Sequence, residues 1–221
     1  FIVAPALTFD FQQDYIDLDD VRYLDMATGT GKSYVLYGLA MILLAEGLVD
    51  KVLVLCPSNT IEAGLLAKFR DLAGNADLRD VLPATAKFRA PRIINATESI
   101  IEGTICIENY HAVLQHVKSS IRDSLLGNGE RVAVFNDEAH HIHDIKSGGE
   151  ATEVEWQKSL TKIAAKKGRQ FVQVDFSATP YNDIGSGKNK KKQFFPHIIV
   201  DFDLKMAMKA GLVKSLARSE E

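Results

Sequence analysis

This 221-residue chain has few cysteines, a small net charge and few long apolar runs, and each of these features argues against a class of protein. The two cysteines, Cys56 and Cys106, lie in apolar, strand-like runs. This predicts buried, reduced thiols in a cytoplasmic protein, with a disulfide or a metal pair as the alternative. The net charge of −3, from 26 Lys and Arg against 29 Asp and Glu, excludes a global basic field, so any nucleic-acid contact needs a local patch. The apolar run from Tyr34 is interrupted at Glu46 and Gly47, too early for a membrane span.

Short apolar blocks of strand character alternate with longer blocks of helical spacing. The expected strands are 22–25, 51–57, 92–95, 104–108, 132–135 and 170–176, and the expected helices are 34–45, 60–73, one or two within 112–126, and 151–167. Such alternation predicts an α/β fold in which helices cover both faces of a mainly parallel sheet. Residues 74–91 are expected to be a surface connection, and residues 185–192 a mobile loop.

The most informative segment is the phosphate loop, residues 26–33, Met-Ala-Thr-Gly-Thr-Gly-Lys-Ser, between an expected strand and an expected helix. Its glycines let backbone amides turn inward where a side chain would collide with phosphate. The lysine adds a positive charge, the serine hydroxyl stands where a Mg²⁺ ligand is needed, and the following helix faces the anion with its positive end. Met26 departs from the usual small residue, and the alternative is a glycine-rich turn before an ordinary helix. The predicted phosphate-binding residues are Thr28, Gly29, Thr30, Gly31, Lys32 and Ser33.

An acidic segment, Asn-Asp-Glu-Ala-His-His at 136–141, directly follows the expected strand 132–135. Because the carboxyl ends of parallel strands line one crevice, these acids are expected to face the nucleotide. We assign Asp137 to the metal shell through water, together with Ser33, and Glu138 to polarising the attacking water. The alternative is a helix cap or a solvated acidic turn.

Histidines at 140, 141 and 143 suggest a metal cluster, but no cysteine or further histidine has matching spacing. We expect His140 instead to hydrogen-bond a neighbouring motif. A third segment, Ser177-Ala178-Thr179-Pro180, also follows a buried strand, and its hydroxyls would link the phosphate site to whatever lies across the cleft. On its own, this tetrapeptide is equally compatible with an ordinary strand-ending turn.

Taken in order, the three segments resemble motifs I, II (of the DEAH type) and III of superfamily 2 helicases, over nearly the whole chain. The greatest likeness is to the motor part of the restriction (Res) subunits of type III restriction–modification enzymes. Those subunits show a similar Met-Ala-Thr-Gly-Thr-Gly-Lys loop, Asp-Glu-Ala-His-His and Ser-Ala-Thr-Pro, and a stretch like residues 201–214. The resemblance implies a three-layer RecA-like domain of the P-loop NTPase class, with ATP and Mg²⁺ as cofactors. It also implies an ATP hydrolase that moves on DNA, with Lys32 among its catalytic residues and with His140, Ser177 and Thr179 coupling phosphate state to DNA.

The resemblance further implies a larger assembly. The family motor has two RecA-like domains, and the second supplies an arginine finger worth about 10³–10⁵ in turnover. We expect a lead-in at 1–20, the first RecA-like domain at 21–200, and at 201–221 a linker toward a second domain that this chain lacks. Alone, the chain is therefore expected to bind ATP but to hydrolyse it poorly. The implied partners are DNA (a duplex or a displaced strand), a methyltransferase or specificity subunit, and the second domain.

Two strand-end loops are candidates for nucleic-acid contact. Cys56-Pro57-Ser58 looks like motif Ia, and Glu108-Asn109-Tyr110-His111 resembles a later DNA-facing motif. We predict that Pro57, Ser58, Asn109 and His111 touch a phosphate backbone without reading sequence, with ordinary loop capping as the alternative. The lysines at 188, 190, 191 and 192 would add electrostatic grip, although a solvated loop is the interpretation we favour.

Two rival functions share these features. An RNA helicase carries the same three motifs. A nucleotide-gated regulatory or scaffold module would also bind ATP, but its turnover would be indifferent to any nucleic acid.

Overall fold

The computed structural model describes residues 22–26, 31–95, 97–114, 124–125, 130–140, 150–179, 181–184, 191–194 and 198–211. Its main element is a seven-stranded sheet of order β3-β4-β2-β5-β6-β1-β9, in which neighbouring strands run parallel. The strands are β1 (Arg22–Met26), β2 (Lys51–Cys56), β3 (Arg92–Ile94), β4 (Thr104–Asn109), β5 (Arg131–Asp137), β6 (Gln170–Ser177) and β9 (Ile198–Phe202). Apolar runs without polar interruption make β2 and most of β5 fully buried, as expected for central parallel strands.

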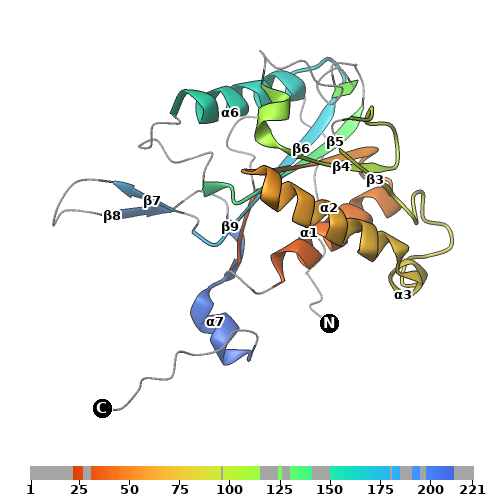
Figure 1. The fold of residues 1–221 in the computed structure, drawn as a ribbon, viewed down its shortest axis with the longest axis horizontal. Coiled ribbons are helices and arrows are strands. Elements are labelled where there is room, and N and C mark those ends of the chain that lie inside the picture. The colour runs from red at the N-terminus through yellow and green to blue at the C-terminus, as the bar shows by residue number, and fades with distance from the viewer. Residues whose placement is uncertain are drawn as a thin grey trace.

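Helices cover both faces of this sheet (Figure 1). On one face, α1 (Lys32–Ala45) and α2 (Asn59–Gly74) enclose a core that includes Leu36, Leu44, Val54, Phe69 and Phe135. On the other face, α6 (Glu150–Ala164) and the 3-10 helix η2 (Tyr110–Val113) enclose a second core that includes Leu53, Val113, Val134, Trp156 and Leu160. The three-layer, mainly parallel α/β arrangement expected for a RecA-like domain is confirmed.

Several elements differ from the expectation. Helix α3 (Ala76–Asp80) interrupts the expected connection 74–91, because the Asn75 side chain accepts hydrogen bonds from the backbone N–H groups of Asp77 (2.9 Å) and Leu78 (3.3 Å). Of the expected loop 185–192, residues 191 and 192 belong instead to β8 (Lys191–Phe194), which pairs antiparallel with β7 (Tyr181–Ile184), and residues 185–190 lie outside the described residues. Residues 115–123 and 126, most of the expected helical segment 112–126, lie outside the described residues.

Strand β9 forms the edge of the main sheet beside β1 and spans residue 200, where the sequence analysis divides domain from linker. Helix α7 (Leu204–Lys209) follows, begun by Asp203, whose carboxylate accepts a hydrogen bond from Met206 N at 2.7 Å. The division into lead-in, domain and linker stays a prediction. Every helix in the described ranges is too short or too polar to cross a membrane.

Both cysteines are free and buried, on the neighbouring strands β2 and β4, as predicted. Cys56 Sγ donates to the carbonyl oxygen of Glu108 at 3.4 Å. Burial raises the pKa of the Cys56 thiol to about 12, and it also raises the pKa of the Cys106 thiol. Both thiols are therefore protonated and unreactive in the folded state.

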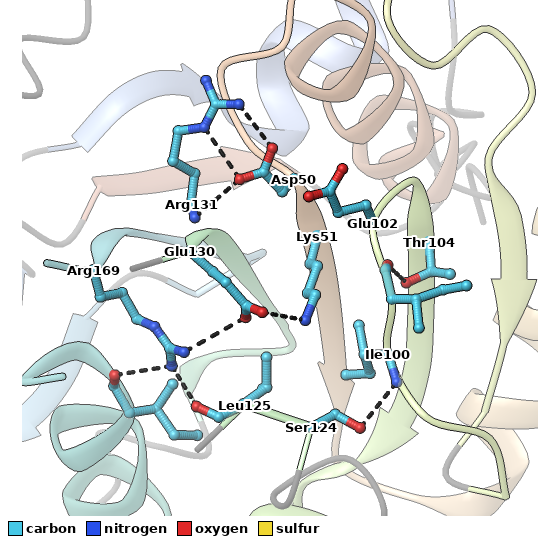
Figure 2. Close-up of polar contacts among 12 residues, drawn as sticks. Asp50, Lys51, Ile100, Glu102, Thr104, Ser124, Leu125, Glu130, Arg131 and Arg169 are labelled. Carbon is cyan, nitrogen blue, oxygen red and sulfur yellow. Dashed lines mark hydrogen bonds and ion pairs between the residues drawn. The ribbon is translucent and has the colours of Figure 1, made fainter. Parts of the chain in front are cut away.

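The starts of the central strands, at the edge opposite the phosphate loop, are held by ion pairs (Figure 2). Arg131 at the start of β5 donates to both oxygens of Asp50, with Nη2 2.7 Å from Oδ1 and Nε 3.2 Å from Oδ2. Glu130 lies between Lys51 at the start of β2 (2.8 Å) and Arg169 before β6 (3.6 Å). These contacts connect β2, β5 and β6 at their amino ends.

We expect Asp50→Asn to lower the free energy of unfolding at neutral pH by about 1 kcal/mol, a figure that allows for solvent screening of partly exposed partners. Burial alone would raise the pKa of Asp50, but hydrogen bonds from Arg131 and Lys87 outweigh it and lower this pKa to about 2. A carboxyl whose folded pKa is lowered stabilises the fold above its unfolded pKa of about 4, and that contribution is lost as the pH falls toward about 2.

Urea unfolding of wild type and Asp50→Asn, at neutral pH and at about pH 3, measures this contribution. The difference between the two proteins should shrink at the lower pH. The exposed Asp71 of α2 offers a matched control, since Asp71→Asn should change stability little at either pH. A difference between wild type and Asp50→Asn that did not depend on pH would contradict the assigned role of the Asp50 carboxylate.

Candidate active site

The carboxyl ends of β1, β5 and β6 lie at one edge of the sheet. β6 is the middle strand, with Ser177 aligned with Asp25 of β1 and Phe176 aligned with Asp137 of β5. The phosphate loop leaves β1 at this edge, while the acidic segment leaves β5 and the Ser-Ala-Thr segment leaves β6. The structure therefore brings together the three segments that the sequence analysis grouped.

The start of α1 is arranged to receive an anion. Gly31 is the N-cap, with a φ of 91°, a conformation that glycine adopts without strain. Among the described residues, no side chain caps this helix, and its first turn holds no acidic residue. Its first N–H groups and the positive end of its dipole are thus available to phosphate oxygens. The predicted contacts of Thr28, Gly29 and Thr30 lie outside the described residues.

Lys32 connects the phosphate loop to the acidic segment. Its ammonium lies 3.3 Å from Asp137 Oδ1 and donates a hydrogen bond to Glu138 Oε1, although the two segments are 106 residues apart in sequence. The side chains of Lys32 and Asp137 are only 12% and 7% exposed. A lysine and two carboxylates therefore meet in a largely desolvated place beside the start of α1.

The environment of Asp137 favours an additional cation. Burial raises the pKa of the Asp137 carboxyl; the charge of Lys32 opposes this shift, and the charge of Glu138 adds to it. A divalent cation would favour the ionised carboxylate, and the carboxylate of Asp137 and the hydroxyl of Ser33, the second residue of α1, are oxygen donors of the kind that Mg²⁺ prefers. In the part of the chain that the structure describes, no group of three or more His, Cys, Asp or Glu side chains is placed to hold a metal.

Glu138 has an unusual backbone conformation. Its φ of 52° is the one positive value among the described residues other than glycine. Its N–H donates to Asp137 Oδ1 at 3.1 Å, and the next N–H, of Ala139, donates to the carbonyl of Phe176 in β6 at 3.0 Å. A left-handed glutamate costs on the order of 1 kcal/mol or more, and such strain clusters at functional sites because the surrounding structure holds it in place.

A chain of polar contacts joins the acidic segment to the end of β6. His140 Nδ1 lies 3.2 Å from Ser177 Oγ and 3.6 Å from Glu138 Oε2. Ser177 Oγ also accepts a hydrogen bond from the backbone N–H of Thr179 at 3.0 Å. This geometry matches the expected contact of His140 with a neighbouring motif, while Pro180, His141 and His143 lie outside the described residues.

Two buried residues next to these polar contacts, Asn136 and Asp175, were not singled out from the sequence. Asn136 Nδ2 donates to Asp175 Oδ1 at 2.6 Å, between aligned positions of β5 and β6. Gln173 Nε2 donates to the same oxygen at 3.1 Å, and Asn136 and Asp175 are fully buried. In the sequence, these residues are recognisable as polar positions within two otherwise largely apolar strands, β5 and β6. The pair connects the residue before Asp137 to the strand that ends in Ser177.

Residues 12–182 match the family described as "Type III restriction enzyme, res subunit". The chain belongs to this family. Membership places this res-subunit domain among the helicase-type NTPases, in agreement with the resemblance found in the motifs. No curated protein matches the chain.

Three solved structures are similar to the res-subunit domain at low sequence identity. Two are of the UvsW helicase of bacteriophage T4, each with a TM-score of 0.41 and 14% identity, covering 72% and 73% of this chain and 27% and 48% of theirs. The third, the NS3-like helicase from Alongshan virus, has a TM-score of 0.44 and 13% identity, covering 72% of this chain and 33% of its own. The res-subunit domain thus spans less than half the length of each of these proteins.

Two of the four residues predicted to contact nucleic acid, Ser58 and Asn109, have side chains engaged in capping contacts. Ser58 caps α2, its Oγ accepting from Ile61 N at 3.3 Å. The Asn109 amide accepts from His111 N at 3.1 Å and donates to Glu62 Oε2 at 3.1 Å. Pro57 is half-buried and His111 is exposed. The predicted role of these four residues stays a prediction, and the structure shows capping contacts at Ser58 and Asn109.

Proposed function

We propose that this chain is the ATP-binding motor domain of a DNA helicase or translocase of the type III restriction kind. Paired with a second RecA-like domain, it would couple ATP hydrolysis to movement on DNA. The observation that carries the proposal is the meeting of Lys32 with Asp137 and Glu138 beside the start of α1. Free cysteines support a cytoplasmic location.

Each residue has a distinct role in this proposal. Lys32 and the loop amides, Thr28 to Ser33, hold the β and γ phosphates. Ser33 and Asp137 would hold Mg²⁺, and the ion would neutralise charge on the phosphate oxygens. Glu138 accepts a hydrogen bond from the attacking water and turns its lone pair toward the γ phosphorus. In the structure Lys32 pairs with Glu138, and a bound phosphate would compete with Glu138 for the lysine and leave the carboxylate to water.

The contact between His140 and Ser177 would carry the phosphate state outward. When Glu138 exchanges Lys32 for water, the nearby His140 ring experiences a changed charge, and Ser177 and Thr179 share its hydrogen-bond chain. The polypeptide runs on from Thr179 to the start of β7 at Tyr181. The end of β6 would therefore connect the phosphate site to β7.

The test compares ATP turnover of the full-length protein with no nucleic acid, with DNA and with RNA. We expect DNA to raise turnover several-fold, because a translocase hydrolyses ATP in step with movement. Stimulation by RNA alone would indicate an RNA helicase, and turnover indifferent to both would indicate a regulatory or scaffold module. If the protein is of the type III restriction kind, we further expect a methyltransferase or specificity subunit to copurify with the full-length protein.

A further inference from the structure

The β7–β8 hairpin extends from the body of the molecule as an arm (Figure 1). Its two strands pair with each other in a separate two-stranded sheet, with Tyr181 opposite Phe194 and Ile184 opposite Lys191. β7 begins at Tyr181, two residues after Thr179. The arm therefore starts where the hydrogen-bond chain from the acidic segment ends.

Aromatic rings and ammonium groups are placed together on this arm. The Phe194 side chain is 59% exposed, and its ring centroid lies 5.5 Å from that of Tyr181 in an edge-to-face contact. Lys192 Nζ lies 3.8 Å from the centroid of the Tyr181 ring, and Lys191 is exposed as well. Cross-strand ring contacts and a cation over a ring stabilise a two-stranded hairpin that would otherwise be marginal.

The chemistry of this surface matches a single strand of nucleic acid. Exposed aromatic rings offer π-faces on which unpaired bases stack, and neighbouring lysines offer positive charge to the phosphates between those bases. In the sequence, residues 181–194 carry four lysines against one aspartate, in a chain whose net charge is −3, so this segment is locally basic, and Lys191 and Lys192 belong to β8. A duplex hides its base faces and would use only the lysines. The side chains of Ser58 and Asn109, at the ends of β2 and β4, are by contrast engaged in capping contacts.

We infer that the β7–β8 hairpin is a single-strand-binding arm, in which a DNA base stacks on Phe194 while Lys191 and Lys192 contact the flanking phosphates. The inference rests on the proposed function and names a surface through which it would engage DNA. Because the arm follows Thr179 directly, its position would respond to the state of the nucleotide site.

The first test is the affinity of full-length Phe194→Ala for a single-stranded DNA oligonucleotide, measured by fluorescence anisotropy. Loss of one base stack should weaken binding about tenfold. Binding to a duplex of the same sequence should change little. Because β7 and β8 form a sheet separate from the main one, thermal unfolding of the domain should be nearly unchanged, and Phe194→Trp, which keeps an aromatic ring opposite Tyr181, should restore the affinity.

The second test addresses the lysines through salt dependence. Each single-strand phosphate contact contributes about 0.7 to the log–log salt slope, so the double variant Lys191→Ala/Lys192→Ala should flatten that slope by about 1.4. Two substitutions elsewhere serve as matched controls and should leave binding unchanged. Lys68→Ala removes a lysine whose Nζ lies 4.0 Å from the Tyr34 ring centroid, and Ile101→Ala truncates a 52% exposed apolar side chain.

The outcomes separate this inference from the proposed function. If DNA stimulates wild-type turnover but the arm variants bind the oligonucleotide as tightly as wild type does, the hairpin does not bind single-stranded DNA and the inference is overturned. If wild-type turnover ignores all nucleic acid, the proposed function fails first. An RNA oligonucleotide of the same sequence completes the set, because loss of RNA binding without loss of DNA binding would overturn the assignment to DNA.

Discussion

Lys32→Ala is expected to weaken ATP binding by at least about thirtyfold, because removing one partner of a desolvated charge pair costs on the order of 2–5 kcal/mol. In the free protein Lys32 is shared between Asp137 and Glu138, and in the complex it would neutralise phosphate oxygens. Its loss also leaves the two carboxylates facing each other. This should raise the pKa of Asp137 further, since the hydrogen bond from Glu138 N–H would then be the remaining contact that opposes burial and the charge of Glu138. Equilibrium titration with a fluorescent ATP analogue measures the affinity.

Lys87→Ala is the matched control, since it removes a lysine that pairs with Asp50 at the opposite edge of the sheet. It should lower stability slightly and leave ATP affinity unchanged. Lys32→Arg keeps the charge but replaces a compact ammonium with a planar guanidinium, and it should recover only part of the affinity. Unchanged ATP affinity in a folded Lys32→Ala protein would refute the assignment of the phosphate loop.

Glu138→Gln is expected to separate binding from hydrolysis. Loss of a positioned group that accepts a proton from water should lower the rate of phosphate release by about 10²–10⁴-fold. ATP affinity should be unchanged or higher, because the substitution removes a carboxylate that competes with phosphate for Lys32. Single-turnover phosphate release, measured on the full-length protein, gives the rate, and titration with the fluorescent analogue gives the affinity.

Glu46→Gln provides the matched control for this variant. Glu46 is the exposed C-cap of α1, at the far end of the helix that the phosphate loop begins. Its substitution should change neither rate nor affinity. A Glu138→Gln protein that released phosphate at the wild-type rate would exclude Glu138 as the residue that activates water.

The parts of the fold that the sequence predicted well are those with a strong local signal. The unbroken apolar runs of β2 and β5 need burial on both faces, and the glycines of the phosphate loop mark a strand-to-helix turn. Once the sheet is parallel, the carboxyl ends of its strands meet at one edge, so adjacency of the phosphate loop, Asp137 and Ser177 follows from topology alone.

The parts that were missed depend on contacts between distant residues. β9 is short, and its pairing with β1 joins segments separated by most of the chain. The hairpin lies in a lysine-rich segment whose polar composition indicated a loop, and the contact between Tyr181 and Phe194 is visible only in the folded state. The bond between Asn136 and Asp175 likewise requires the register of β5 on β6. At Ser58 and Asn109, residue types that suit phosphate contact also suit capping, and local pattern does not separate the two uses.

The two buried thiols give the molecule an internal reporter. Cys56 and Cys106 are the chain's complete set of cysteines, and both are inaccessible on the neighbouring strands β2 and β4. A thiolate-seeking dye can modify them only during excursions that separate these strands or strip away the helices above them. The speed of labelling therefore follows transient opening of the sheet centre, and it can be read in the unaltered protein before and after nucleotide is added.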